Sequence, residues 1–150
     1  MIKKLREVSD PSPYRLWYND WVEKHAKGNV LDVGKSQYWD YGFPTIDTNK
    51  KLNPTIVQDI CNCNLPDETY DTVLCNGMYE CVSDSQKMVN EVMRILKPKG
   101  VAIFGFVGKD YKPYKKDWKF YDKNIDFSKW GKSYKDFNNE YHFIICLKYC

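Results

Sequence analysis

Three aspartates stand at or near the ends of short apolar runs, where their carboxylates could meet a polar ligand: Asp32, Asp47 and Asp59. Gly34 follows two residues after Asp32, and a glycine at such a place lets the backbone approach a bound molecule closely. An ionised carboxylate offers acceptor oxygens for hydroxyl groups and can attract an ammonium group. These residues are therefore candidates for a ligand-binding site.

The apolar runs that carry these acids indicate buried strands of a parallel sheet. Strands are expected over about 29–33, 44–47, 55–59, 71–76, 100–107 and 141–149. Strands that alternate with helices or tight crossovers favour a doubly wound α/β fold. Ligands of such sheets bind beyond the carboxyl ends of the strands, where the strand order reverses. The acids are therefore expected to gather at that edge of the sheet.

Helices are expected to flank this sheet. One covers residues 12–28, from an N-terminal Ser-Pro pair to Gly28. Its aromatic stripe either packs on the sheet or forms a lid over the ligand, and it consists of Tyr14, Trp17, Tyr18, Trp21 and His25. Another helix covers about 84–96 with Asp84 as its N-cap. Residues 97–100 contain a proline and a glycine, which are expected to end that helix.

The order and the endings of these runs resemble the class I S-adenosyl-L-methionine (SAM)-dependent methyltransferases. The resemblance spans roughly residues 13–108, and it is carried by Val30-Leu31-Asp32-Val33-Gly34, by Asp59-Ile60, by residues 64–82 and by residues 94–103. It implies a Rossmann-like, mostly parallel sheet with a C-terminal antiparallel strand. We expect a single domain over 1–150, divided into 12–28 (N-terminal helix), 29–108 (cofactor-binding core), 109–140 (basic and aromatic) and 141–150 (last strand).

The resemblance also implies SAM as cofactor and a role for each strand end. Asp47 would accept hydrogen bonds from both ribose hydroxyls, and Asp59 and Ile60 would contact the adenine. Asp32 would attract the ammonium group of the methionine part. The expected cofactor-binding set is Asp32, Gly34, Asp47, Asp59, Ile60, Asn76 and Tyr79. No catalytic residue is predicted, and the expected reaction is methyl transfer to an oxygen or nitrogen of a small-molecule or sugar-type acceptor.

The chain departs from the family pattern in ways that favour an alternative function. The glycine-rich loop has only its first glycine, because residues 34–37 read Gly-Lys-Ser-Gln. Cys81 stands where the family usually has a histidine. Only fourteen residues separate Asp32 from Asp47, and only eleven separate Asp47 from Asp59, so both crossover helices must be shortened. A methyltransferase-like binding or partner module without activity is therefore a second hypothesis.

The remaining composition bounds the partners. Residues 109–135 hold nine Lys, four Asp and eight aromatic residues, so a third hypothesis is a nucleic-acid binder through this segment. The other interpretations of the segment are a cover over the sheet edge and a lid over a small substrate. No apolar run is long enough to span a membrane, and the six cysteines are expected to be reduced thiols rather than a disulfide framework or a metal site. We expect a cytoplasmic protein, with a homodimer as a further hypothesis.

Overall fold

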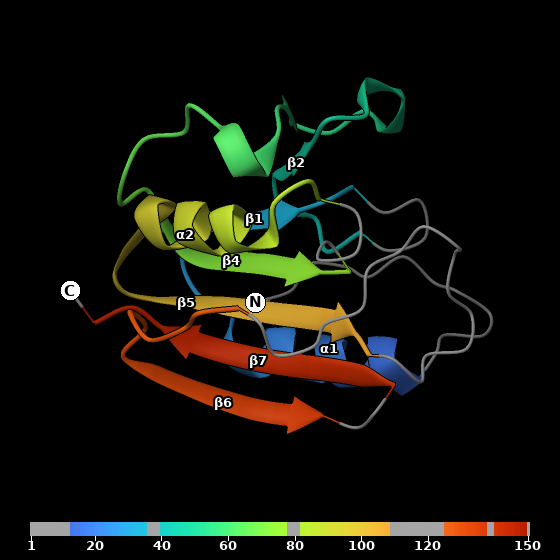
Figure 1. Ribbon diagram of the computed structural model, residues 1–150. Coiled ribbons are helices and arrows are strands. Elements are labelled where there is room, and N and C mark those ends of the chain that lie inside the picture. The colour runs from blue at the N-terminus through green and yellow to red at the C-terminus, as the bar shows by residue number, and fades with distance from the viewer. Residues whose placement is uncertain (1–12, 36–39, 78–81, 109–124, 138–139, 150) are drawn as a thin grey trace.

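A seven-stranded sheet forms the centre of the molecule, with the strand order β3-β2-β1-β4-β5-β7-β6 (Figure 1). This computed structural model describes residues 13–35, 40–77, 82–108, 125–137 and 140–149. The strands are β1 (Val30–Val33), β2 (Thr45–Asp47), β3 (Ile56–Val57), β4 (Tyr70–Asn76), β5 (Leu96–Val107), β6 (Lys132–Phe137) and β7 (Tyr141–Leu147).

The pairing of the strands confirms the predicted fold class. The strands from β3 to β5 pair in parallel, whereas β7 is antiparallel to both β5 and β6. The chain moves outward from β1 through β2 to β3 and then returns to place β4 on the other side of β1. The strand order therefore reverses between β1 and β4, and this is the point where a doubly wound sheet binds its ligands.

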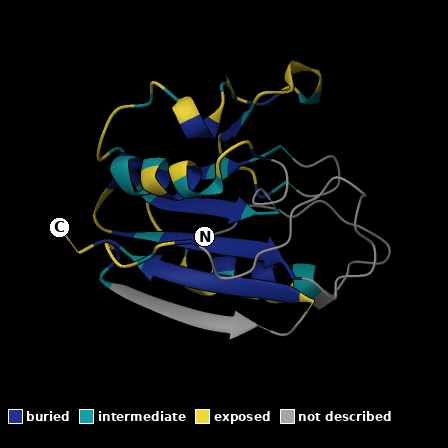
Figure 2. Cartoon of the chain, viewed as in Figure 1, coloured by how far each residue is buried: buried dark blue, intermediate teal, exposed yellow. Residues whose placement is uncertain are grey.

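The helices α1 (Pro13–His25) and α2 (Ser85–Ile95) lie on opposite faces of the sheet (Figure 1). Successive residues of a strand point to opposite faces, and the core accordingly divides in two. On β4, Val73 and Cys75 join the cluster packed with α2, while Leu74 joins the cluster packed with α1. The central strands are almost entirely buried as a result (Figure 2).

Part of the aromatic stripe of α1 packs on the sheet, while Trp17 and His25 are exposed. Tyr18 is buried, and its hydroxyl donates to the carbonyl of Ile103 at 2.8 Å and accepts from the amide of Cys75 at 3.1 Å. This hydroxyl therefore links neighbouring strands β4 and β5. Tyr14 stacks on Tyr141 of β7, with ring centroids 5.2 Å apart. These contacts agree with the packing interpretation of the stripe.

The ends of α2 follow its sequence signals. The Asp84 side chain accepts from the amide of Lys87 at 3.1 Å, which confirms the predicted N-cap. The helix ends at Ile95, but β5 begins at once with Leu96. Leu96 pairs with Tyr70 and Val101 pairs with Thr72, so residues 97–100 form a bulge within β5 rather than a loop before it.

The connections on the β3 side of the sheet are short. Between β2 and β3 the chain makes one 3-10 turn, η1 (Lys50–Leu52), and between β3 and β4 it makes another, η2 (Ile60–Asn62). Thr45 and Thr55 close the first of these connections by reciprocal hydrogen bonds, because each hydroxyl accepts from the other residue's amide at 3.0–3.1 Å. The expectation of a minimal second crossover is confirmed.

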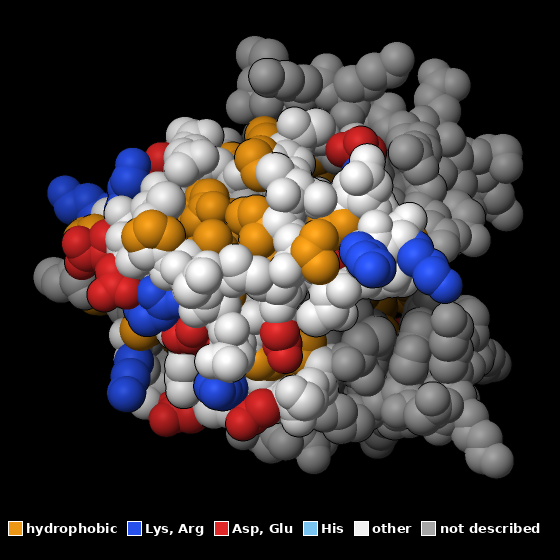
Figure 3. Space-filling model, turned by 90° about the horizontal axis from the view of Figure 1, so that it is seen from above, with side chains coloured by type: hydrophobic (Ala, Val, Ile, Leu, Met, Phe, Trp, Pro, Cys, Tyr) orange, Lys and Arg blue, Asp and Glu red, His pale blue; other side chains and the backbone are white. Residues whose placement is uncertain are grey.

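Strand β6 was not expected from the sequence, which placed its residues in a basic and aromatic segment. It pairs antiparallel with β7 and closes one edge of the sheet. Lysines and an aspartate within the strand obscure its pattern in the sequence, yet charges are common on edge strands because they discourage pairing with other chains. The opposite edge is β3, where Val57 is 53% exposed, and hydrophobic side chains lie among charged ones on that side of the molecule (Figure 3).

Candidate functional site

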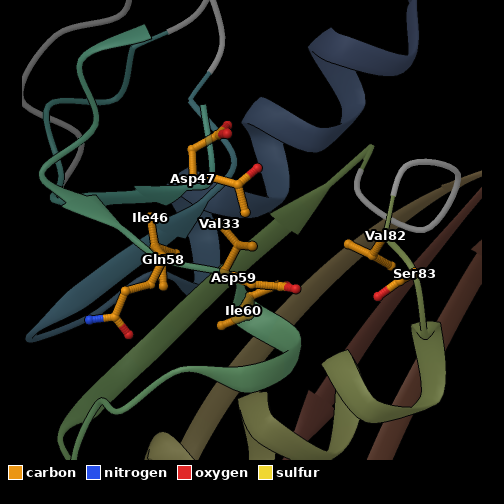
Figure 4. Close-up of a pocket in the computed structure, with 9 residues that line it drawn as sticks. Val33, Ile46, Asp47, Gln58, Asp59, Ile60, Val82 and Ser83 are labelled. Carbon is orange, nitrogen blue, oxygen red and sulfur yellow. The ribbon is translucent and has the colours of Figure 1, made fainter. Parts of the chain in front are cut away.

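A pocket of about 370 Å³ opens at the carboxyl ends of β1, β2 and β3 (Figure 4). Its volume lies in the range of small-molecule sites, which begins near 300 Å³. Its lining combines apolar walls with a few polar groups: Val33, Ile46, Asp47, Thr48, Gln58, Asp59, Ile60, Val82 and Ser83. The pocket therefore contains three of the predicted site residues, Asp47, Asp59 and Ile60.

Asp47 lies at the end of β2 and is held by the backbone around it. Its Oδ2 accepts from the amide of Lys35 at 2.8 Å, and its Oδ1 accepts from the amide of Asn49 at 2.8 Å. Both bonds fix the orientation of the carboxylate. Each oxygen has a further lone pair, so Asp47 can still accept from a pair of hydroxyl groups in the pocket.

Asp59 and Ile60 follow β3, where the backbone turns into η2. Asp59 caps that turn, because its Oδ1 accepts from the amide of Cys61 at 2.9 Å. No described residue donates to its Oδ2, and the side chain is exposed to the pocket. Figure 4 shows Asp59 and Ile60 facing Val82 and Ser83 across the hollow. The arrangement offers an apolar slot with one acceptor oxygen at its side.

Asp32 lies outside this pocket. Along β1, Leu31 and Val33 face α2, so Asp32 faces α1 together with Val30. The pKa of its carboxyl is raised to about 7, because the effect of burial outweighs that of Arg15, which lowers the pKa; Asp40 also raises it and Lys35 also lowers it. The sequence placed Asp32 in one site with Asp47 and Asp59, but Asp32 is not among the residues that line their pocket.

The surroundings of Asp32 form a polar cluster beneath α1. Arg15 donates from Nη1 to the hydroxyl of Tyr41 at 2.9 Å, and Tyr41 donates to Oδ1 of Asn19 at 2.5 Å. Tyr41 and Asn19 are buried, and burial raises the pKa of Tyr41 to about 12. Lys35 forms an ion pair with Asp40 at 3.4 Å. Charged groups thus collect at the carboxyl end of β1 on the α1 face.

Gly34 and Asn76 lie at the ends of the two central strands. Gly34 has a φ of +90°, which glycine adopts without strain, and its amide donates to the carbonyl of Ile46 at 2.8 Å. Asn76 ends β4, and its Oδ1 accepts from the hydroxyl of Tyr141 at 2.9 Å. These residues lie beside the point where the strand order reverses. Tyr79 and Cys81 lie outside the described residues.

The pocket also contains residues that the sequence did not single out as site residues. Thr48 and Gln58 are direct neighbours of the predicted acids Asp47 and Asp59, and Val82 and Ser83 precede α2. Thr48 and Gln58 could have been predicted from the sequence, because the neighbours of a residue that lines a pocket often line it too.

Among the described residues, no group of three His, Cys, Asp or Glu side chains could hold a metal ion. No helix in the described part of the chain is long and apolar enough to cross a membrane.

Known proteins with similar folds were found by comparison of the structure. A SAM-dependent methyltransferase from Thermotoga maritima has a TM-score of 0.68 at 14% identity, and covers 90% of this chain and 89% of its own. The N-methyltransferase NodS from Bradyrhizobium japonicum has a TM-score of 0.70 at 11% identity, and the match covers 93% of this chain and 99% of NodS. The cyclase SpnF has a TM-score of 0.69 at 11% identity, and the match covers 97% of this chain and 86% of SpnF. At these identities the likeness shows the fold alone.

The sequence comparisons identify the family. A ubiquinone biosynthesis O-methyltransferase from Hydrogenovibrio crunogenus is 28% identical over 91 residues, which are 59% of this chain and 38% of that protein. The chain therefore spans well under half the length of this relative. Residues 27–104, more than half of the chain, match the family model of the methyltransferase domain. The chain belongs to the methyltransferase domain family, and this membership implies S-adenosyl-L-methionine as its cofactor.

Proposed function

We propose that this protein transfers the methyl group of SAM to an oxygen or nitrogen nucleophile of a small-molecule or sugar-type acceptor. The observation that carries the proposal is the pocket with Asp47 and Asp59 at the carboxyl ends of neighbouring strands. Its features match the parts of an adenosyl group: a fixed carboxylate for two hydroxyls, an apolar slot for a flat base, and a second carboxylate at the side of that slot.

The residues of this chain fit the cofactor as follows. Asp47 would hold the ribose hydroxyls, because both of its oxygens are already oriented by backbone amides. Asp59 would accept from the amino group of adenine, and Ile60 and Val82 would pack on the ring. Gly34 and Asn76 lie at the ends of β1 and β4, between which the strand order reverses. Together with Asp32 and Tyr79 they would hold the methionine part of the cofactor.

The chemistry that the cofactor supplies is an electrophilic methyl group on a sulfonium. The protein's part is to orient and enclose this group, because in-line approach of the nucleophile supplies much of the rate of such a transfer. The carboxylates of Asp47 and Asp59 would fix the adenosyl end by hydrogen bonds. Asp32 would neutralise the ammonium charge from the α1 face, where the effect of burial on its pKa outweighs that of Arg15 and Lys35 and a further cation would favour the ionised form.

Calorimetric titration with SAM and with its demethylated product, S-adenosyl-L-homocysteine, tests the proposal. We expect micromolar binding to the wild type and loss of measurable binding in Asp47→Ala. Asp20→Ala is a matched control, because Asp20 is an exposed acid of α1 that forms a surface ion pair with Lys24. The absence of heat and of thermal stabilisation with either ligand would refute the cofactor site.

A second candidate function is a methyltransferase-like binding module without activity. The short crossovers favour it, because a single 3-10 turn, η1, replaces a helix between β2 and β3. A full helix would have contributed its N-terminal amides and dipole to the site. Binding of SAM without methyl transfer to any acceptor in a broad panel would support this function over the enzyme.

Nucleic-acid binding through residues 109–135 remains a further alternative. Residues 109–124 lie outside the described part of the chain, and residues 132–137 form strand β6. A nucleic-acid binder would lose affinity for oligonucleotides steeply as salt is raised. Weak salt dependence in a fluorescence anisotropy titration would exclude this function.

A cytoplasmic location and a homodimer also belong to the proposal. All four described cysteines are free thiols, which is consistent with a reducing compartment. Leu16 and Trp17 of α1 are 53% and 47% exposed, and they offer an apolar surface to a second copy. Sedimentation of the protein at several concentrations distinguishes monomer from dimer.

A further inference from the structure

A hydrogen bond between side chains crosses the sheet at its carboxyl edge. Asn76 ends β4 and Tyr141 begins β7, and β5 runs between these strands. The Tyr141 hydroxyl donates to Oδ1 of Asn76 at 2.9 Å, so the two side chains meet above β5. We call this contact the Asn76–Tyr141 bridge.

Gly105 makes room for the Asn76–Tyr141 bridge. It pairs with Asn76 in the ladder between β4 and β5. A Cβ atom at position 105 would lie 2.2 Å from Oδ1 of Asn76 and 3.1 Å from the ring of Tyr141. The missing side chain at this position is therefore what allows the bridge to cross the strand.

Aromatic rings hold Tyr141 in place for the bridge. Its ring stacks on Phe143 with centroids 4.9 Å apart, and on Tyr14 of α1 with centroids 5.2 Å apart. The interplanar angles are 22° and 18°. Because the ring is confined from both sides, the hydroxyl has a defined position from which to donate.

The Asn76–Tyr141 bridge fixes the orientation of the Asn76 carboxamide. Oδ1 is engaged by the hydroxyl of Tyr141, while no described residue accepts from Nδ2. Asn76 is half-buried at the end of β4, next to the reversal of strand order. An amide NH₂ group can only donate. The Nδ2 of Asn76 is therefore available to donate to an oxygen of a ligand.

We propose that Tyr141 is a positioning residue that holds Asn76 as a hydrogen-bond donor to the carboxylate of the cofactor's methionine part. The inference rests on the proposed function, because it assumes that SAM lies along the carboxyl edge of the sheet. In that part of the cofactor the carboxylate supplies the acceptor oxygens, and the ribose hydroxyls are assigned to Asp47. The Asn76–Tyr141 bridge thus assigns a role in cofactor binding to β7 and, through Tyr14, to α1.

The test compares two ligands that differ in the group Asn76 would recognise. S-adenosyl-L-homocysteine carries the carboxylate, whereas 5′-methylthioadenosine has the same adenosyl end and lacks the amino acid. In Tyr141→Phe we expect the affinity for the first ligand to fall about tenfold, with no change for the second. Tyr149→Phe is the matched control, because Tyr149 is 57% exposed and lies outside the site, and it should leave both affinities unchanged.

Two further variants test the same bridge independently. Asn76→Asp keeps an acceptor for Tyr141 but has no NH₂ group. Its affinity for S-adenosyl-L-homocysteine should therefore fall further than that of Tyr141→Phe. Gly105→Ala should displace the carboxamide and reproduce the selective loss, and thermal melting checks that it folds. Equal weakening of both ligands in Tyr141→Phe, or unchanged binding in Asn76→Asp, would overturn the inference. A wild type that binds neither ligand would instead refute the proposed function itself.

Discussion

Replacing Asp32 by asparagine should stabilise the protein at neutral pH and weaken its binding of the cofactor. The carboxyl of Asp32 lies beneath α1, and burial raises its pKa from 3.8 to about 7. Asparagine has nearly the same shape and stays neutral, so it resembles the protonated acid that this environment favours. The variant therefore removes an unfavourable buried charge and, with it, the group that would neutralise an ammonium ion.

The magnitude follows from the shift in pKa. Below about pH 4, Asp32 is protonated in both the folded and the unfolded states, so it does not reduce the free energy of unfolding. Between about pH 4 and 7 the unfolded chain releases the proton while the folded protein keeps it, so stability falls as pH rises. A shift of about three units corresponds to about 4 kcal/mol at most. Above pH 7 both states are ionised and the loss stays constant.

Urea denaturation of wild type and Asp32→Asn at a series of pH values between about 4 and 8 measures this difference. We expect Asp32→Asn to be more stable by roughly 2–4 kcal/mol at pH 8, with the advantage shrinking towards pH 4. Asp20→Asn, at an exposed position of α1, controls for the substitution itself. Calorimetry with S-adenosyl-L-homocysteine should show weaker binding to Asp32→Asn in spite of its higher stability.

A pH-independent difference between Asp32→Asn and wild type would refute the reasoning. So would a wild type that is the more stable protein at pH 8, because the charged carboxylate would then be favourable in the fold. Arg15 and Lys35 are the groups that could produce that result, since both lower the pKa of Asp32. We expect instead that the effect of burial on the pKa of Asp32 outweighs the effects of Arg15 and Lys35.

Two further predictions concern stability alone. Tyr18→Phe should lower the free energy of unfolding by about 1–3 kcal/mol, because the buried carbonyl of Ile103 and amide of Cys75 would lose their shared partner. Urea denaturation measures the change. An unchanged midpoint would mean that these two backbone groups do not need the Tyr18 hydroxyl. Asp84→Ala should lower the free energy of unfolding by about 1 kcal/mol through loss of the cap on α2, whereas Asp84→Asn should retain most of the stability in the same assay.

Much of the fold was predictable because its signals are local. The short apolar runs predicted the strands from β1 to β4, and Asp84 predicted the start of α2. Strand β6 was missed, since edge strands tolerate the charged residues that normally indicate a loop. The bulge at 97–100 was read as a break, because a proline and a glycine end a helix as readily as they interrupt a strand.

The site was predictable to the extent that strand ends locate it. Asp47, Asp59 and Ile60 line one pocket, as their positions after neighbouring strands indicated. The side of the sheet that Asp32 faces could have been predicted from the alternation of Leu31, Asp32 and Val33 along one strand. Tyr141 could not be related to Asn76 from the sequence, because their contact joins residues 65 positions apart across a third strand.

The thin β3 edge of the sheet makes local opening a property of the pocket. Strands β2 and β3 have only three and two residues, and β3 is the edge strand of the sheet that the described residues form, so we expect this corner to open at a lower free energy than the central strands. A ligand held between Asp47, Asp59 and Val82 ties the corner to the residues before α2. Because a ligand stabilises the state that binds it, amide hydrogen exchange in β2 and β3 would slow with cofactor concentration while exchange in β4 and β5 would change little. Under the proposed function, the cofactor would therefore stabilise this corner of the sheet more than its centre.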